Sequence, residues 1–391
     1  MNINRRDFMR VAVPSAAAVA ALRSVELPML GQAYGARPAA ELVITDKTVV
    51  LSGDGLAISN QQRVQDLARL MTKYEKFADS YLVGGAVAEL EQKMAAMLGK
   101  EDAAFLPTGT LANNVAVRLL CGEHRHAIVQ QESHLYQDES DAASLLSGLN
   151  LVPLGAGKAC PSYEEVVAAI DVAEKSPYPI VVGAISIESP VRRADGASVP
   201  YALAERISKL ARSKGIGMHL DGARLLLLSG TAEFDVKRYS ALFDTVYISL
   251  YKYLGAPFGA MLAGKKDVIA KVRETRHVYG GTVYHGWMAA LPALDAVDGF
   301  QQRFAEAHRA GERLLAGLQA AGGFEILRVE HGSNIAFAQL TPARADGLVE
   351  RLAKQDIHVR PLHEGRLTLM VNETILRRTP EELVAAFVGK A

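Results

Sequence analysis

The sequence feature that most constrains the fold is a regular alternation, from about Glu101 onward, of short apolar runs with longer amphipathic segments. The longer segments repeat their apolar residues at helical spacing, whereas the short runs have the length and composition of buried strands. We expect strands at residues 103–106, 127–130, 151–154, 180–187, 217–220 and 245–249, with helices such as 111–120, 163–174 and 201–214 between them. This order is typical of βαβ units, so we predict an α/β domain with a mostly parallel sheet covered by helices.

The pattern changes toward the C-terminus. A further apolar run at 259–263 follows a Gly-Ala-Pro turn closely enough to pair as a hairpin strand. Long helices are expected around 287–297 and 302–320, followed by a smaller α+β domain with strands at 324–329, 334–340 and 366–371 and helices at 342–354 and 380–388. We place the large domain at 37–282, and the linker helices with the small domain at 283–391.

Size and charge limit the possible partners. With 391 residues, 49% of them hydrophobic, the chain can bury a large core. Its 43 basic residues equal its 43 acidic residues, so no net charge favours nucleic acid or an anionic membrane, and a small-molecule partner is expected. The two cysteines, Cys121 and Cys160, lack metal-ligand spacing and are too few for a disulfide framework.

The first 36 residues differ in character from the rest. Arg5 and Arg6 begin the pattern Arg-Arg-Asp-Phe-Met-Arg, and an apolar run at 11–22 follows that is too short to cross a bilayer as a mature helix. We predict a twin-arginine signal and a periplasmic or secreted protein. The alternative is a merely basic N-terminus on a cytoplasmic protein.

Two polar motifs follow strands, where an α/β sheet presents its ligands. Thr108-Gly109-Thr110 joins a predicted strand to a helix, and its free backbone N–H groups suit a phosphate. Asp221 ends another strand, three positions before Arg224, where its carboxylate suits a protonated pyridinium nitrogen. Taken alone, each motif is more often an ordinary helix N-cap than a ligand site.

A lysine follows the next strand. Lys252 lies among apolar and aromatic residues, and burial there would lower its pKa and yield a neutral amine that attacks aldehydes. A single lysine after a strand is usually a solvated charge. A phosphate turn, a carboxylate and a lysine at successive strand ends, however, would surround one ring, and this combination indicates pyridoxal 5′-phosphate (PLP).

These residues resemble the low-specificity L-threonine aldolase and aromatic amino acid β-eliminating lyase family, which belongs to the PLP-dependent enzymes of fold type I. The similarity is clearest between residues 80 and 290. It is carried by Tyr81, residues 88–91, residues 98–113, His134 with Tyr136, Ile187-Glu188, residues 219–224, Lys252 with residues 254–257, and Gly280-Gly281.

The resemblance implies a role for each matching position. Lys252 would carry the cofactor, Asp221 would bind its pyridinium nitrogen, and Gly109 and Thr110 would form the phosphate cradle. His134 would stack on the ring and, with Lys252 and Asp221, take part in catalysis. Arg224 would contact the cofactor or the substrate carboxylate, and Arg366 and Tyr81 are the other candidate substrate-binding residues.

The sequence departs from the family pattern at several positions. The Arg-Ser-Asp of the family is Leu51-Ser52-Gly53-Asp54 here, and the acidic loop after the family's tyrosine is residues 82–85, Leu-Val-Gly-Gly. The family's Glu-Asn-Thr-His-Asn is residues 188–192, Glu-Ser-Pro-Val-Arg, which removes a histidine proposed to assist proton transfer. The glycine-rich loop at 280–285 lacks its usual arginine. Without the family's histidine, His134, His285 or a water molecule would have to act as the base.

Three functions are therefore kept open. The first is cleavage of the Cα–Cβ bond of a β-hydroxy-α-amino acid to glycine and an aldehyde. The second is β-elimination or another PLP reaction on a different amino acid, since the binding motifs are common to all these reactions. The third is a secreted PLP-binding protein without catalysis. The resemblance also implies a homodimer or homotetramer in which neighbouring subunits complete each active site.

Overall fold

The computed structural model describes residues 43–232 and 234–389, and residues 44–391 form one compact unit. The predicted twin-arginine segment at 1–36 lies outside the described residues. The boundary predicted at residue 282 stays a prediction, since residues on both sides of it belong to the same unit.

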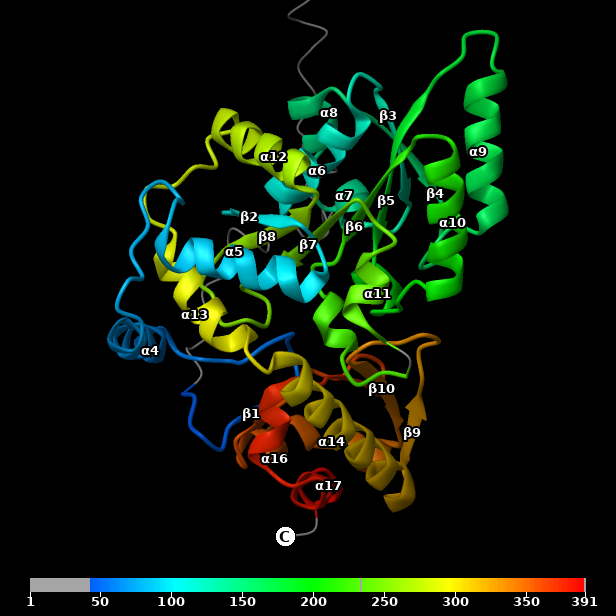
Figure 1. Cartoon of the computed structure of the whole chain (residues 1–391). Coiled ribbons are helices and arrows are strands. Elements are labelled where there is room, and N and C mark those ends of the chain that lie inside the picture. Colours follow the sequence, from blue (N-terminus) through cyan, green and yellow to red (C-terminus); the bar gives the residue numbers. More distant parts are fainter. Residues whose placement is uncertain (1–42, 233, 390–391) are drawn as a thin grey trace, which may run out of the picture. The chain divides into compact units, whose positions relative to one another are not determined.

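The centre of the molecule is a seven-stranded sheet with the strand order β2-β8-β7-β6-β5-β3-β4 (Figure 1). Strand β8 runs antiparallel to both of its neighbours, β2 and β7, whereas the other neighbouring pairs are parallel. The strands are β2 (Asp102–Leu106), β3 (His126–Gln130), β4 (Asn150–Leu154), β5 (Val182–Glu188), β6 (Gly217–Asp221), β7 (Thr245–Ser249) and β8 (Ala260–Gly264). This confirms the predicted α/β fold and the hairpin strand after Lys252.

Successive residues of each strand pack alternately into hydrophobic cores on the two faces of the sheet. In β7, Val246 and Ile248 pack into the cluster on one face of the sheet, whereas Tyr247 packs into the cluster on the other face. This alternation follows from the two-residue period of an extended strand. Both faces are therefore covered by helices, which explains why the strands appear in the sequence as nearly continuous apolar runs.

The helices and 3₁₀ turns of this region precede the strands, connect them or, for the last two, follow β8. They are α4 (Asn60–Lys73), α5 (Gly85–Leu98), α6 (Gly109–Cys121), α7 (His134–Gln137), α8 (Ala142–Ser147), α9 (Tyr163–Lys175), η1 (Arg192–Ala194), α10 (Tyr201–Ser213), η2 (Leu225–Leu228), α11 (Val236–Ser240), α12 (Lys266–Val278) and α13 (Trp287–Val297).

A second cluster of buried residues lies around the long helix α14 (Phe300–Ala321). It includes the three-stranded sheet β12-β10-β9, built from β9 (Phe324–Leu327), β10 (Ile335–Leu340) and β12 (Arg366–Met370). The remaining elements are α15 (Pro342–Ala345), α16 (Leu348–Ala353), β11 (Ile357–His358), η3 (Glu373–Arg377) and α17 (Pro380–Val388).

The N-terminal segment of the unit packs against this C-terminal cluster. Strand β1 (Val49–Val50) pairs in parallel with β11, and Val49 and Leu51 are fully buried there. The buried Asn372 donates through Nδ2 to the carbonyl oxygens of Val50 (2.7 Å) and Gly53 (2.9 Å). This pairing brings residues 51–56 across to the main sheet, where they contribute to the candidate site.

One predicted helix is wrong. The helix expected at 342–354 is broken into α15 and α16, because Gly347 between them adopts a left-handed conformation with φ of 57°. Glycine reaches this region without a steric penalty, so the chain turns between the two short helices. The helices α4, α5 and α12 were not predicted.

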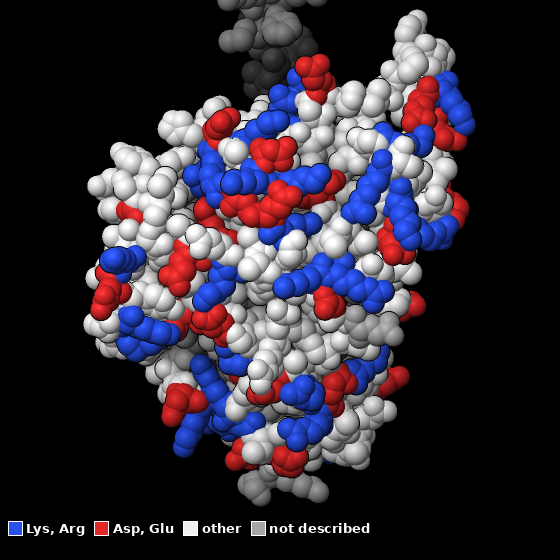
Figure 2. Space-filling model, in the orientation of Figure 1, with Lys and Arg blue, Asp and Glu red and all other residues white. Residues whose placement is uncertain are grey.

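The face of the molecule shown in Figure 2 carries acidic and basic side chains side by side, in keeping with the equal numbers of both charges in the sequence. Within the part of the chain that the structure describes, no helix combines the length and the apolar character needed to cross a bilayer.

Candidate active site

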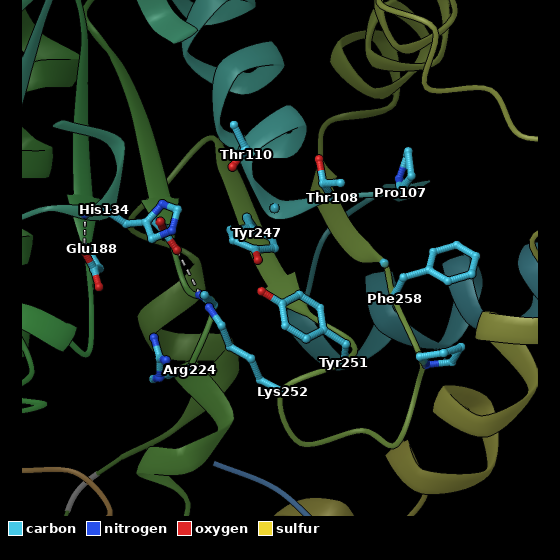
Figure 3. A pocket seen from close by; sticks show the side chains of 15 residues that line it. Pro107, Thr108, Thr110, His134, Glu188, Arg224, Tyr247, Tyr251, Lys252 and Phe258 are labelled. Carbon is cyan, nitrogen blue, oxygen red and sulfur yellow. Dashed lines mark hydrogen bonds between the residues drawn. The ribbon is translucent and has the colours of Figure 1, made fainter. Parts of the chain in front are cut away.

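A cavity of about 290 Å³ lies at the carboxyl ends of β5, β6 and β7, close to the beginning of α6 (Figure 3). Its volume is at the small end of the range of ligand pockets, about 300–1,000 Å³. The lining residues are Pro107, Thr108, Gly109, Thr110, His134, Glu188, Asp221, Ala223, Arg224, Tyr247, Tyr251, Lys252, Pro257, Phe258 and Gly259.

One wall is the N-terminus of α6. Thr108 is the N-cap, and its hydroxyl accepts a hydrogen bond from the Leu111 N–H at 3.2 Å. Gly109 and Thr110 are the first residues of the helix, where backbone N–H groups have no partner within the helix. A Cβ atom at Gly109 would lie only 2.1 Å from the Tyr247 hydroxyl, so glycine is needed for this close approach. The turn is suited to an anion, as the sequence predicted.

The strand register aligns three polar residues in one row across the sheet. Asp221 is paired with Glu188 on one side and with Tyr247 on the other. The Asp221 carboxylate accepts from the Ala223 N–H at 3.1 Å and from Asn113 Nδ2 at 2.8 Å. Main-chain pairing fixes the relative positions of these three residues, and the side chains of all three line the pocket.

Glu188 is a buried carboxyl in this row. Its two oxygens accept from the backbone N–H groups of His134 (2.6 Å) and Arg192 (3.0 Å). Burial and the neighbouring charge of Asp221 raise the pKa of Glu188 to about 7. Glu188 thus holds the beginning of α7, from which His134 projects into the pocket.

Lys252 follows β7 and extends across the pocket toward the side occupied by His134 (Figure 3). Burial and the nearby Arg224 guanidinium lower the pKa of Lys252 to about 8, although Asp221, Asp54 and Glu188 oppose this effect. A larger fraction of the amine is therefore neutral near pH 7 than in an exposed lysine. This is the property that an attacking amine requires.

Arg224 is held by an acidic residue of the N-terminal segment. Its Nε donates to Asp54 Oδ2 at 2.9 Å, and the two side chains are only 13% and 10% exposed. The same segment lies against the turn that carries Lys252, here called the lysine turn. A Cβ atom at Gly55 would lie 2.2 Å from the Lys252 carbonyl oxygen. Asp54 thus stands in the region where the sequence lacks the family's Arg-Ser-Asp motif.

His134 lines the pocket opposite Tyr251. Its Nδ1 lies 3.0 Å from Oε1 of the buried Glu139. Burial of the ring opposes protonation, but the Glu139 hydrogen bond and the charges of Asp221 and Glu139 raise the pKa of His134 above its usual range.

Six of the eight predicted site residues line this one cavity: Gly109, Thr110, His134, Asp221, Arg224 and Lys252. The other two do not line it. Tyr81 is 59% exposed and contacts Tyr284 with a ring-centroid distance of 5.1 Å. The Arg366 guanidinium lies 4.2 Å from the Phe337 ring centroid. The substrate-binding roles of these two residues stay predictions.

His285, one of the three candidates for the base, is also absent from the cavity lining. Its Nδ1 lies 2.7 Å from the Asp79 carbonyl oxygen.

Sequence reasoning missed several residues of the site. Tyr247 and Tyr251 both precede the predicted lysine, and their positions in the strand and turn before it could have indicated them. Glu139 follows His134 by five positions and carries no local motif, so only the folded structure brings it to the histidine.

The sequence model of the beta-eliminating lyase family matches residues 60–341. Over 215 residues the chain is 34% identical to the alanine racemase TOXG of Cochliobolus carbonum, and the match covers 54% of each chain. It is 30% identical over 237 residues to the "Probable low-specificity L-threonine aldolase 2" of Arabidopsis thaliana, covering 59% of this chain and 65% of that one. The chain thus spans between half and two thirds of the length of these two relatives.

Among solved structures, the threonine aldolase of Leishmania major superposes with a TM-score of 0.68. The superposition covers 87% of this chain and 98% of that one at 21% sequence identity. At this identity the likeness establishes a common fold.

Proposed function

Because the chain belongs to the beta-eliminating lyase family, we propose that it is a PLP-dependent lyase that cleaves the Cα–Cβ bond of a β-hydroxy-α-amino acid. The products would be glycine and an aldehyde. The observation that carries this proposal is the meeting of Lys252, Asp221 and the Gly109 turn around a single cavity.

The residues of the cavity fit PLP. The N-terminus of α6 offers backbone N–H groups to the phosphate, and the absence of a Cβ atom at Gly109 leaves the turn close to Tyr247. Asp221 offers a carboxylate to the pyridinium nitrogen, and Lys252 offers an amine of lowered pKa to the aldehyde.

When bound, PLP supplies an electron sink for the bond broken at Cα. The protein's own residues determine which bond at Cα is broken, because they orient the substrate. Arg224 uses Nε for Asp54, so its terminal nitrogens are the donors that can hold a substrate carboxylate. His134, on the wall that carries Glu188, can take up a proton from a β-hydroxyl group.

The test is to add PLP to the purified protein, record the absorption band of the bound cofactor, and supply L-threonine. We expect glycine and acetaldehyde in equal amounts. Lys252→Ala should remove the band, while Lys158→Ala, at an exposed lysine, should leave it intact. A band that persists in Lys252→Ala would refute the attachment site. A band without turnover of any amino acid would favour a PLP-binding protein that has lost catalysis.

A second candidate reaction is racemisation. It is favoured by the 34% identity to an alanine racemase and by Val191 at the position of the family's histidine. Without that histidine, removal of the Cα proton competes better with removal of the β-hydroxyl proton. Incubation with L-alanine, followed by chiral analysis, tests this candidate. Ammonia and a keto acid would instead indicate β-elimination.

We further propose that the protein forms a homodimer or a homotetramer whose subunits complete one another's sites. Support comes from exposed aromatic and apolar side chains on two loops, namely Tyr81 (59% exposed), Val83 (73%) and Tyr284 (59%). Light scattering should give a multiple of the monomer mass. If Tyr81 serves the neighbouring site, mixing inactive Lys252→Ala and Tyr81→Ala subunits should restore activity, and failure to restore it would assign Tyr81 to its own subunit.

We also propose export by the twin-arginine route, on the basis of Arg5, Arg6 and the apolar run at 11–22. This route carries folded proteins, which suits an enzyme loaded with a cytoplasmic cofactor. Replacing both arginines by lysine should leave the protein in the cytoplasm, whereas the unchanged chain should appear in the periplasm or the medium. Equal distribution of both forms would refute export by this route.

A further inference from the structure

A buried hydrogen-bond network behind the pocket joins His134 to Asp221. It consists of Asn113 on α6, Glu139 before α8, and the pair His219 and Thr245 on neighbouring strands. Asn113, His219 and Thr245 are at most 1% exposed, and Glu139 is 5% exposed. Buried polar groups of this kind are stable only when their hydrogen bonds are satisfied, so the network restricts the protonation of each member.

The amide of Asn113 sets the direction of the network. Its Nδ2 donates to Glu139 Oε1 at 2.9 Å and to Asp221 Oδ2 at 2.8 Å, which uses both of its hydrogens. Its Oδ1 lies 3.0 Å from His219 Nε2, which must therefore donate. His219 Nδ1 then accepts from the Thr245 hydroxyl at 2.9 Å. Burial lowers the pKa of His219 to about 4, which keeps this ring neutral.

Glu139 is the other end of the network. Its Oε1 receives the Asn113 amide and also lies 3.0 Å from His134 Nδ1, so Nδ1 carries the hydrogen between them. Nε2 of His134 has no hydrogen-bond partner within residues 43–232 and 234–389. A histidine held in this way presents its unprotonated nitrogen to the pocket.

We propose that Glu139 is a positioning residue for His134. It holds the ring as the Nδ1–H tautomer, with Nε2 free in the pocket, and Asn113 couples this pair to the carboxylate of Asp221. The role rests on the proposed function, in which His134 exchanges a proton with the substrate. The proton passes from the β-hydroxyl to Nε2 as the C=O bond forms and the Cα–Cβ bond breaks, with the electron pair of that bond left on the Cα fragment. Nε2 then gives the proton to Cα, which yields glycine.

The charges around His134 determine the sign of the expected effects. Glu139 and Asp221 favour the imidazolium form, whereas Lys252 opposes it. Glu188 adds a buried carboxyl on the β5 side, where it accepts from the His134 N–H. Removing the charge of Glu139 destabilises the imidazolium form, so the pKa of His134 must fall.

The variant that tests the proposal is Glu139→Gln, because a glutamine Oε1 can still accept from Asn113 and from His134 Nδ1. Histidine ring signals, assigned to His134 by a His134→Gln variant, are titrated by NMR with and without PLP. We expect the pKa of His134 to fall by about one unit, a tenfold change in proton affinity. The acid limb of the kcat profile for glycine formation should move to lower pH by the same amount.

The matched control is Glu132→Gln, at a glutamate whose one hydrogen bond to residues that the structure describes comes from the Gly157 N–H. It should leave the titration of His134 unchanged. Equal pKa values for His134 in the wild type and in Glu139→Gln would overturn the proposal. If Glu139→Gln does not fold, the ring ¹⁵N shifts of the wild-type protein decide, since an Nε2–H tautomer contradicts the proposal. The titration needs no turnover, so its result is distinct from failure of the proposed lyase activity.

Discussion

The pKa of Lys252 makes the attachment of PLP depend on pH in a defined way. Only the neutral amine attacks an aldehyde, and this pKa is lowered to about 8. We expect the rate of attachment to rise about tenfold for each pH unit below that value and to level off above it. Stopped-flow absorbance after mixing the protein with PLP measures this rate.

Replacing Arg224 provides the control for that profile. Since the guanidinium lowers the pKa of Lys252, Arg224→Gln should shift the plateau to higher pH. A wild-type rate that keeps rising far above pH 8 would show that Lys252 behaves as an ordinary exposed lysine.

Glu188 predicts a pH dependence of stability. Its pKa is raised to about 7 in the folded protein, so its contribution to stability is complete below the pKa of the unfolded chain and is lost as the pH rises through 7. Glu188→Gln should remove this loss. At low pH the variant should be less stable by about 1–3 kcal/mol, because glutamine accepts only one of the two backbone N–H groups.

Urea unfolding over a series of pH values measures both effects. Glu132→Gln is again a suitable control, since its single acceptor contact survives the change. If Glu188→Gln kept the pH dependence of the wild type, the loss of stability would have to arise from another group.

At the scale of single residues, the sequence predicted those site positions that follow strands. Asp221 ends β6, Lys252 and Gly109 each lie three residues beyond the end of a strand, and parallel strands bring their carboxyl ends to the same edge. Glu139 and Asp54 could not be found in this way. Their contacts join positions that only tertiary packing determines, such as the 170-residue separation between Asp54 and Arg224.

At the scale of elements, the segment that carries Gly53 and Gly55 offers a matched pair of substitutions. A Cβ atom at Gly55 would lie 2.2 Å from the Lys252 carbonyl oxygen, whereas a Cβ atom at Gly53 would meet nothing within 4 Å. Gly55→Ala should therefore push the segment away from the lysine turn, destabilise the fold by about 1–3 kcal/mol and weaken PLP binding. Gly53→Ala should do neither.

Thermal unfolding and titration with PLP compare the two variants. Equal behaviour would show that the segment makes no specific contact with the lysine turn. Asp54 gives a second check, because a displaced segment also separates it from Arg224.

The strands of the main sheet were predicted more completely than the helices. Strand β7 and helices α13 and α17 have the predicted ends, because apolar runs bounded by turns define them. Helix α4 was missed because Leu70 is its only buried residue, so its sequence is mostly polar. The break at Gly347 was missed because a glycine within an amphipathic pattern marks a turn only when the backbone takes up a positive φ.

At the scale of the whole molecule, Asn372 connects the two ends of the compact unit. It holds the carbonyl groups of Val50 and Gly53, while its Oδ1 accepts from the Thr374 N–H at 2.9 Å. Asn372→Ala should lower the free energy of unfolding by about 1–3 kcal/mol for each buried group left unpaired, and should also weaken PLP binding. Denaturant unfolding and PLP titration measure these effects.

Asn334→Ala is the matched control, since Asn334 is similarly buried but donates to Val371. It should destabilise the fold without affecting PLP binding beyond that loss. If both variants bound PLP as the wild type does, the N-terminal segment would be irrelevant to the site.

The distance along the chain between Asp54 and Arg224 has a consequence for biosynthesis. An emerging polypeptide cannot hold the vitamin B6 ring until the helix after β2, the strand ends of β5 to β7 and the Lys252 turn have all left the ribosome. β8 lies between β2 and β7 in the sheet. Strand β2, which precedes the phosphate turn, therefore cannot join the sheet until the chain has emerged as far as residue 264. Capture of the coenzyme therefore requires a completed central sheet and cannot begin while the first half of the chain is being made.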